Sequence, residues 1–389
     1  MANTLKFGNG QWATGNGTAL AYNDENANYK PLPFDFTRAS SGTVVNQSGL
    51  IETVGSGIPR IDFQGNTKGA LLLEPSRTNS IAYSNDLNAS GWNTFSTDGG
   101  TVTRTSNYGI SPSGKQDSTR VVFTTQFVSL YYSFSGISGD ASATMYVKGV
   151  AGEVIAFGFG SDVSFGQEFT LNGQWQRIEF NATSTNTTLN INSWGSTRDA
   201  SDIEVYGVQL EAGSYATSYI PTSGSAVTRV ADSCNNGANE QVINSTEGVL
   251  YFEGSSIAND GTFKRISIGT SDNLFANSIQ LRYNTSDNSI TYQFRVGNVY
   301  QADLTITTNT TNVNKIACVW KINRFEIWVN GVKQAEDTSG SVPSSNTFNS
   351  LFFGKSSNAL LEPFKGNIKD IKLYDTALTD QELIALTTI

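Results

Sequence analysis

The chain has 389 residues and a formal net charge of −9, and 15% of its residues are charged while 11% are aromatic. Nucleic acids and anionic membranes bind clustered Lys and Arg, so this acidic chain without a basic cluster is not expected to bind either. It contains no histidine, which excludes Ser-His-Asp and Cys-His catalysis and zinc sites built on imidazole. Carboxylate chemistry, such as glycoside hydrolysis, stays open.

Residues 1–75 are rich in Gly, Asn and Pro and contain few strand signals. The clearest is a hairpin with strands at 43–45 and 50–54 around a turn at 46–49. The aromatic residues of this region stand apart from one another, so it has too few contiguous apolar positions to form a core of its own. We therefore predict an extended arm that becomes ordered by docking on another surface. The side chains expected to anchor it are Phe7, Trp12, Phe34 and Phe36.

Residues 76–232 contain short strand-like runs separated by turn clusters. Several runs alternate apolar with polar residues, which is typical of a strand with one face in a core and the other in solvent. Many short strands at even spacing indicate an antiparallel sandwich or jelly roll. The predicted strands are 119–123, 129–134, 143–148, 153–157, 174–180, 188–191 and 202–208.

A polar segment at 223–240 leads into a second set of strand-like runs, so residues 233–389 are predicted to form a second sandwich. Within it, an apolar run at 325–329 precedes Asn330 and Gly331. This pair predicts a tight hairpin, because both residues tolerate positive φ.

Near the end of the chain, Thr379 and Glu382 have the spacing of a capping box, which predicts one short helix with Leu383 and Leu386 facing inward. The predicted fold class is therefore all-β. It consists of two tandem antiparallel β-sandwiches (jelly rolls) after an extended N-terminal arm, with one short C-terminal helix.

The two cysteines, Cys234 and Cys318, lie far apart in the sequence, and nothing in their spacing requires a disulfide. Cys318 stands in an apolar strand-like run, so we predict that it is buried as a small hydrophobic side chain. The first residues contain Gly, Asn and Gln where a secretion signal would be apolar. We therefore expect synthesis in a cytoplasm.

Four segments carry a distinctive pattern: Lys30–Ser41 (KPLPFDFTRASS), Gly49–Glu52, Pro59–Phe63 and Leu71–Asn79 (LLLEPSRTN). Together they resemble a conserved module of bacteriophage structural and fibre proteins. In that family the module precedes a jelly roll that ends in a stretch similar to Val205–Thr222. The middle region also resembles jelly-roll carbohydrate-binding modules, most visibly at Gly173–Arg177. Residues from about 245 onward resemble laminin-G-like, concanavalin-like lectins, most specifically at 364–374 and 378–382.

This resemblance implies a virion protein, a fibre or decoration on head or tail, that assembles in the host cytoplasm and is exposed outside the cell after release. It implies a virion-attachment and oligomerisation arm at 1–75, a carbohydrate-binding-module-like jelly roll at 76–232 and a lectin sandwich at 233–389. The partners implied are other virion proteins, which the four anchoring aromatic residues would contact, and cell-surface glycans. Phage fibres are commonly three-fold, so the implied self-association is a homotrimer.

Sugars bind flat aromatic faces flanked by amide and carboxylate groups. Aromatic residues in or near stretches rich in Asn and Ser are therefore candidates for a glycan platform, and the alternative for each is packing in the core or at its rim. The glycan-binding candidates are Trp92, Tyr131, Tyr132 and Trp194.

A concanavalin-like domain can bind calcium through oxygen ligands, and Asp260, Asp272 and Asp370 are available for this. No loop has the dense, regular oxygen spacing of a dedicated calcium site, so a solvated turn explains each residue better. We predict no metal site and no cofactor, with calcium as the alternative.

Glycoside hydrolysis needs two carboxylates about 5–9 Å apart, and Glu168, Glu179, Glu204 and Glu211 stand in no recognisable motif. A tailspike usually contains a long parallel β-helix with its own repeat, and the chain has no such period. The predicted function is a non-enzymatic virion protein that displays lectin-like domains to glycans. The alternatives are a polysaccharide-degrading tailspike and a purely architectural protein without glycan binding.

Overall fold

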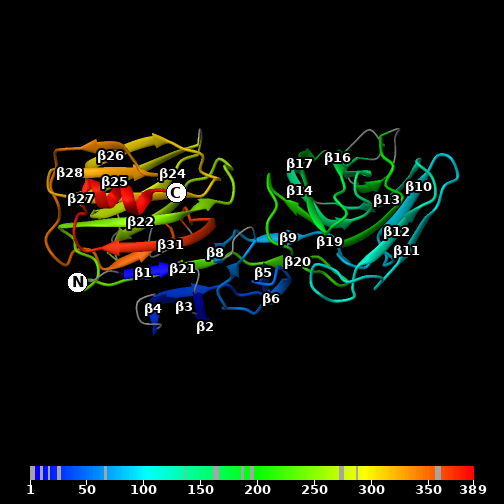
Figure 1. Ribbon diagram of the computed structural model, residues 1–389, viewed down its shortest axis with the longest axis horizontal. Coiled ribbons are helices and arrows are strands. Elements are labelled where there is room, and N and C mark those ends of the chain that lie inside the picture. The colour runs from blue at the N-terminus through cyan, green and yellow to red at the C-terminus, as the bar shows by residue number, and fades with distance from the viewer. Residues whose placement is uncertain are drawn as a thin grey trace. The chain divides into compact units, whose positions relative to one another are not determined.

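The computed structural model in Figure 1 describes residues 5–8, 12–15, 18–23, 28–64, 68–135, 137–160, 166–184, 188–192, 197–270, 276–285, 288–354 and 361–389, with side chains from residue 34 onward except 184 and 192. The chain folds into two compact units. The first comprises residues 1–41, 54–75 and 231–389, and the second comprises residues 42–53 and 76–230. Strands dominate both, and the one helix in the described ranges is α1 (Asp380–Thr387). The predicted all-β class with a short C-terminal helix is confirmed.

Antiparallel sheets form the first unit. One has eight strands in the order β29-β28-β27-β22-β31-β8-β7, with β1 also paired to β31. Its strands are β1 (Leu5–Gly8), β7 (Ile61–Asp62), β8 (Ala70–Leu73), β22 (Glu247–Ser256), β27 (Asn314–Lys321), β28 (Arg324–Val329), β29 (Val332–Asp337) and β31 (Gly366–Tyr374). The second sheet, in the order β26-β25-β24-β23-β30, contains β23 (Lys264–Gly269), β24 (Ser278–Tyr283), β25 (Ser289–Val296), β26 (Val299–Thr307) and β30 (Ser350–Phe352). A smaller sheet contains β2 (Trp12–Gly15), β3 (Thr18–Asn23), β4 (Asn28–Thr37) and β21 (Ser233–Asn235).

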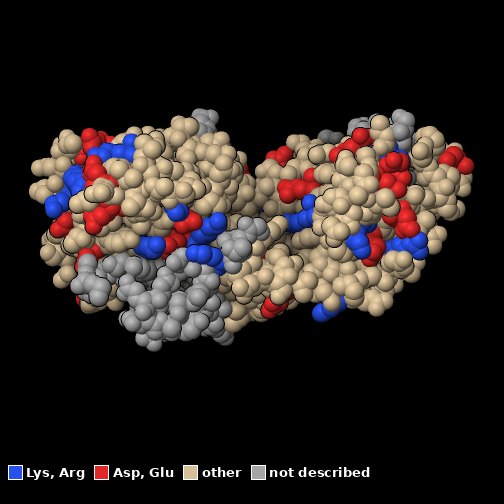
Figure 2. Space-filling model, viewed as in Figure 1, with Lys and Arg blue, Asp and Glu red and all other residues tan. Residues whose placement is uncertain are grey.

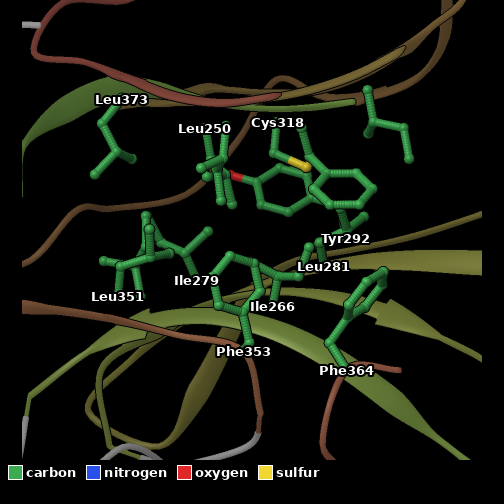
Figure 3. Packing of buried hydrophobic residues seen from close by; sticks show 14 of the residues in the cluster. Leu250, Ile266, Ile279, Leu281, Tyr292, Cys318, Leu351, Phe353, Phe364 and Leu373 are labelled. Atoms are coloured by element: carbon green, nitrogen blue, oxygen red, sulfur yellow. The ribbon is translucent and has the colours of Figure 1, made fainter. Parts of the chain in front are cut away.

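The apolar faces of the eight-stranded and five-stranded sheets meet in one continuous core (Figure 3). Leu250 and Cys318 of the first sheet face Ile266 and Tyr292 of the second. The Tyr292 hydroxyl donates a hydrogen bond to the backbone carbonyl of Val319 at 2.9 Å, so its polar tip is satisfied inside the core. Cys318 is a buried free thiol, as the sequence predicts, and burial raises its pKa.

The C-terminal helix α1 packs on the other face of the eight-stranded sheet, where Leu383 contacts a small second core that includes Trp328. The predicted capping box is present. Backbone Thr379 N donates to Glu382 Oε2 at 2.8 Å, and Glu382 N donates to Thr379 Oγ1 at 3.3 Å. Leu383 is fully buried as predicted, whereas Leu386 is only partly buried.

Both predicted hairpins are present. β28 and β29 pair around Asn330 and Gly331, whose φ angles of 51° and 85° fit the tight turn. In the second unit, β5 (Gly42–Val45) and β6 (Ile51–Val54) form a two-stranded sheet. Its turn is closed by Asn46 Oδ1, which accepts the backbone N–H groups of Ser48 and Leu50 at 3.0 Å each.

Two five-stranded antiparallel sheets form the sandwich of the second unit. One, in the order β10-β13-β18-β15-β16, contains β10 (Trp92–Ser96), β13 (Val128–Ser133), β15 (Val154–Phe159), β16 (Gln167–Thr170) and β18 (Thr188–Asn192). The other, in the order β11-β12-β19-β14-β17, contains β11 (Val102–Thr105), β12 (Thr119–Phe123), β14 (Gly139–Lys148), β17 (Gln176–Ser184) and β19 (Asp202–Ala212). β9 (Arg77–Asn79) and β20 (Val227–Arg229) form a short ladder beside them. Val121, Leu130, Met145, Phe157 and Val205 are among the fully buried core residues.

The structure corrects the prediction of a separate N-terminal arm. β8 extends the eight-stranded sheet beside β31, and all four of its residues are buried. Residues 42–53 belong to the second unit. The apolar positions of β8 do pack on another surface, but that surface is the sandwich of the same chain. A strand added to a sheet pairs its backbone groups and buries its apolar side chains at the same time.

The structure also corrects the prediction that Phe34 and Phe36 anchor the arm on another surface. Phe34 and Phe36 on β4 are each 1% exposed and belong to the core of the first unit, so neither side chain is available as a docking anchor. The Phe34 ring stacks on Phe353 with centroids 5.7 Å apart. Phe7 and Trp12 lie outside the residues whose side chains are described.

Five charged side chains are buried where the N-terminal segments meet the C-terminal strands of the first unit. Asp232 accepts hydrogen bonds from Arg38 Nη1 at 3.1 Å and, on its other oxygen, from Arg60 Nη2. Arg60 Nη1 donates to Glu74 Oε2 at 2.6 Å. Lys365 Nζ donates to the backbone carbonyls of Glu74 and Asp232 at 3.2 and 3.0 Å. Since buried charges are costly unless paired, this cluster determines how the segments assemble.

The second unit contains a comparable set of buried polar side chains. Asn79 accepts two backbone N–H groups at 3.1 Å and donates to two backbone carbonyls. Glu211 accepts from Thr217 N at 2.9 Å and Thr217 Oγ1 at 2.5 Å, and Arg229 Nη1 donates to the same Thr217 Oγ1 at 3.1 Å. Gln209 Oε1 accepts a backbone N–H at 2.6 Å. Residues in the segments that resemble the phage module are thus largely structural.

Surface charges in the described ranges occur mostly as mixed pairs. Arg120 Nη2 lies 2.5 Å from an oxygen of Asp202, and Lys148 Nζ lies 3.2 Å from an oxygen of Glu204. On the face in Figure 2, blue and red atoms are interspersed in small groups, and the described residues form no continuous basic area there.

Candidate functional site

The outer face of the five-stranded sheet in the first unit is polar. Side chains alternate along each strand, so those between the core positions point away from the core. The register places these outward side chains in rows across β23, β24, β25 and β26. We call this surface the polar face, and its residues are Arg265, Ser267, Ser278, Gln280, Arg282, Thr291, Gln293, Arg295, Tyr300, Asp303 and Thr305.

Hydrogen bonds fix the buried end of the polar face. Arg265 donates through Nε to Glu362 and through Nη1 to Gln280 Oε1. Gln280 Nε2 in turn donates to Ser278 Oγ at 3.0 Å. Burial is the main reason that the pKa of Arg265 is lowered from its usual value, and Glu362 partly offsets this effect. These side chains are satisfied by one another and are positioned before any ligand arrives.

Aromatic rings support the guanidinium groups of this face. The Phe263 ring centroid lies 5.1 Å from Cζ of Arg282 and 5.8 Å from Cζ of Arg265. The Tyr300 ring lies 4.6 Å from Cζ of Arg295 and is 47% exposed. Such cation–π contacts hold the flat guanidinium groups in place while leaving their edges free to donate hydrogen bonds.

The open end of the polar face carries partners for a hydroxyl-rich ligand. Asp303 is exposed and accepts a hydrogen bond from Gln293 Nε2 at 3.1 Å. Arg282 and Arg295 are partly exposed, and the exposed ring of Tyr300 lies beside Arg295. Guanidinium donors, a carboxylate acceptor and an aromatic surface together can bind a polyol or a carboxylated sugar by directed hydrogen bonds and ring contact.

Sequence reasoning missed these residues, although part of the signal was present. The runs at 278–283 and 289–295 alternate apolar with polar residues. This alternation places Gln280 and Arg282 on the same face of the first strand, and Thr291 and Gln293 on the same face of the second. The contact of Gln293 with Asp303 depends on strand register, which no local pattern reveals.

Trp92 and Tyr132, predicted as glycan-binding candidates, do not form a platform. They are 4% and 9% exposed, pair across β10 and β13, and pack edge-to-face with centroids 5.3 Å apart. Trp92 Nε1 donates to the Tyr83 carbonyl at 3.4 Å, and the Tyr132 hydroxyl accepts the Ala82 N–H at 3.1 Å. The alternative of core packing is therefore correct for both.

The other two candidates have different outcomes. Tyr131 is partly exposed on the opposite side of β13, where it pairs with Asn93 and Asn190 of the neighbouring strands. Trp194 lies outside the described residues. The four candidates therefore do not come together as one aromatic surface among the residues that the structure describes.

The aspartates considered for calcium are engaged elsewhere. Lys264 Nζ lies 2.6 Å from an oxygen of Asp260, and Lys372 Nζ lies 2.5 Å from an oxygen of Asp370, while Asp272 lies outside the described residues. Over the described ranges, no group of three His, Cys, Asp or Glu side chains is placed to hold a metal ion.

The carboxylates considered for hydrolysis accept hydrogen bonds from neighbouring groups, among them Glu179, whose Oε1 accepts Asn181 Nδ2 at 2.7 Å. Glu168 contacts Arg198 Nε at 3.0 Å, and Glu204 accepts Ser118 Oγ at 2.8 Å. Glu211 is buried by its bonds to the backbone and side chain near the end of β19. Each has a structural partner of its own.

The comparison with protein families matches part of the first unit. Residues 234–384 match the concanavalin A-like lectin/glucanases superfamily. The comparison with curated proteins found no match. No helix in the described ranges is long and apolar enough to cross a membrane.

Several solved structures are similar to parts of the chain, with TM-scores below 0.5. One is the CBM40 of the Ruminococcus gnavus IT-sialidase, with 16% identity, a TM-score of 0.33, and coverage of 39% of this chain and 93% of that one. Another is the native heptameric SAP-like pentraxin from Limulus polyphemus, with 13% identity, a TM-score of 0.31, and coverage of 39% and 72%. A third is domain 4 of AbnA, a GH43 extracellular arabinanase from Geobacillus stearothermophilus, with 15% identity, a TM-score of 0.34, and coverage of 45% and 82%.

The family match and the sheet topology of the first unit agree. The matched segment contains the whole five-stranded sheet with its polar face and most of the eight-stranded sheet. Residues 234–384 therefore form a lectin-like β-sandwich domain.

Proposed function

We propose that this protein is a non-enzymatic bacteriophage virion protein that binds surface glycans through the polar face of its lectin-like domain. The observation that carries the proposal is the polar face itself, whose partly or fully exposed residues Arg282, Asp303, Arg295 and Tyr300 lie in three successive rows across β24, β25 and β26. The match of residues 234–384 to a lectin superfamily supports the same assignment.

The virion role rests on the segments that resemble the phage module. In this proposal the protein is a homotrimeric fibre or decoration, and the segment around Phe7 and Trp12 contacts other virion proteins. A shallow face supplies few contacts and gives weak binding per site, so several copies on one particle would provide useful adhesion through multivalency. Light scattering of the purified protein should give the mass of a trimer, and a monomer would remove this part of the proposal.

An enzymatic role is not part of the proposal. The chain contains no histidine, and the carboxylates of the lectin-like domain nearest the polar face, Glu362 and Asp303, accept hydrogen bonds from Arg265 and Gln293.

The experiment is a glycan array of bacterial surface polysaccharides probed with the purified full-length chain, followed by affinity measurement for the ligands found. Arg282→Ala and Tyr300→Ala should each weaken binding about tenfold, as expected when a charge-assisted bond or a ring contact is lost. Arg120→Ala is the matched control, because Arg120 also lies over a tyrosine ring, 5.0 Å from that of Tyr108, but in the second unit. An array without signal, or equal losses in the control, would favour the purely architectural alternative.

A further inference from the structure

The second unit contains a cavity that the lectin-like domain does not include. It has a volume of about 510 Å³ and lies between the β5–β6 hairpin, the loop around Ser113–Asp117 and strand β19. The hairpin is tied to that loop by the backbone N–H of Ile51, which donates to the carbonyl of Pro112 at 2.9 Å. Small-molecule sites in proteins typically have volumes of about 300–1,000 Å³. The cavity therefore has the size of a ligand site.

The inner wall of the cavity is preorganised. Tyr206 and Tyr219 stand side by side with ring centroids 5.4 Å apart. Asn85 Oδ1 accepts the Tyr219 hydroxyl at 2.7 Å and the Gly207 N–H at 3.0 Å, which fixes the orientation of the amide. Thr43 Oγ1 donates to the Tyr219 carbonyl at 2.5 Å and fastens the hairpin to this wall.

The hydroxyl of Tyr206 keeps its proton and can donate a hydrogen bond. Burial is the largest cause that raises the pKa of Tyr206 to about 12, and the nearby charge of Asp117 contributes. Hydrogen bonds with Ser113 and Asn85 offset this only partly. Tyr206 therefore stays neutral at any physiological pH and can take part in a hydrogen-bond network with a bound hydroxyl group.

The outer wall carries groups of both charges. Glu52 Oε2 accepts Asn46 Nδ2 at 3.2 Å, and both oxygens of Asp117 lie 3.3 Å from Ser113 Oγ. Lys115 lines the same cavity and is exposed. Asp117 thus keeps most of its acceptor capacity, since a carboxylate offers about four acceptor positions.

We propose that this cavity binds a neutral mono- or disaccharide. Vicinal hydroxyl groups would donate to the carboxylates of Asp117 and Glu52 and accept from Lys115, and the apolar side of a sugar ring would contact Leu50 and Tyr206. An anionic ligand would meet the two carboxylates, so the wall favours an uncharged polyol over an anion. Charge-assisted bonds to the hydroxyl groups supply the orientation.

This site is independent of the polar face in the proposed function. All residues that line the cavity belong to the second unit and lie outside the segment 234–384 that matches the lectin superfamily. The hairpin that closes it comes from the N-terminal region, whose contribution to the second unit cannot be inferred from local sequence. The chain therefore carries two candidate sugar sites in two separate units.

The test uses the full-length chain and a panel of neutral sugars: glucose, galactose, N-acetylglucosamine, lactose and cellobiose. Saturation-transfer NMR and calorimetry should detect at least one of them, with weaker signals for glucuronic acid and N-acetylneuraminic acid. Asp117→Asn and Glu52→Gln should each weaken binding about tenfold, the loss expected for one charge-assisted hydrogen bond. Glu52 is exposed, so this variant keeps the test decisive if Asp117→Asn destabilises the fold.

Two controls separate this site from the polar face. Asp140→Asn removes a carboxylate of the second unit that also accepts one hydroxyl, Thr183 Oγ1 at 2.8 Å, but lies away from the cavity, and it should leave binding unchanged. Arg282→Ala should also leave it unchanged, because Arg282 lies in the first unit. The proposal is overturned if no neutral sugar binds, if both cavity variants bind like the parent, or if Arg282→Ala abolishes the signal instead.

Discussion

Asp232 holds two buried arginines together, and this single carboxylate is the residue on which the assembly of the first unit depends most. Its two oxygens accept from Arg38 and Arg60, and the side chains of all three are 0% exposed. Asp232→Ala should therefore cost about 3–5 kcal/mol of unfolding free energy, because two buried guanidinium groups each lose an ion-pair partner. Denaturant unfolding of the variant measures this loss.

The matched control for that variant is Asp202→Ala. Asp202 pairs with Arg120 at 2.5 Å, but both side chains are more than a third exposed. An exposed pair contributes only about 0–1 kcal/mol, so this variant should unfold close to the parent. Equal effects of the two substitutions would contradict the structural role of the buried cluster.

Glu326 gives the first unit a defined response to acid. Burial favours its neutral form, but hydrogen bonds from Arg324, Trp328 and Lys333 outweigh burial and hold the pKa of Glu326 below its usual value. A lowered folded-state pKa adds stability above the normal glutamate pKa, and this stability is lost as the pH falls through the folded value. Glu326→Gln should therefore lower the melting temperature at pH 7, and the difference from the parent should shrink below about pH 4.

The control for Glu326 is its neighbour Glu336, which also contacts Lys333, at 3.0 Å, but is 49% exposed. Glu336→Gln should change the melting temperature little at either pH. If the effect of Glu326→Gln were the same at pH 7 and at pH 3, the ion network would not be its cause.

At the scale of elements, the docking of β4 depends on a close approach at Gly237. A Cβ on this glycine would lie 2.0 Å from the Phe34 ring, and Gly237 also exchanges backbone hydrogen bonds with Leu351 of β30. Gly237→Ala should push Phe34 off its site and cost about 1–3 kcal/mol, the usual range for overpacking. Gly55→Ala is the control, since its nearest atom would be 3.9 Å away. Thermal melts that rank the two variants in the opposite order would contradict this packing.

Elements with strong local signals were predictable from the sequence. The Asn330-Gly331 hairpin, the hairpin at 42–54 and the capping box of α1 all depend on residues within a few positions of one another. The docking of β8 on β31 does not, because the strands come from opposite ends of the chain and pair through register. The polar face depends on the register between consecutive strands, and the cavity depends on contacts between distant segments, so alternation placed their residues on faces without bringing them together.

At the scale of the whole molecule, the N-terminal region is part of the fold rather than an appendage. Deleting residues 1–60 would remove Arg38 and Arg60 and leave Asp232 and Glu74 buried without these partners. We expect the truncated chain to lose the cooperative melt of the first unit and to aggregate, because two buried carboxylates lose their cations and the small sheet with β4 is missing. A truncated chain that melts cooperatively at the parent temperature would show that the region is dispensable for folding.

The central claim is that the protein holds glycans without cleaving them, and one measurement tests it most directly. Purified full-length chain is incubated with bacterial surface polysaccharide, and saturable binding and newly formed reducing ends are followed in the same samples. The account predicts saturable binding that rises with the number of associated copies, and a constant number of reducing ends. Absence of binding would contradict it, and so would a steady release of reducing ends that Glu52→Gln or Asp117→Asn abolishes, since those two carboxylates would then act as a catalytic pair.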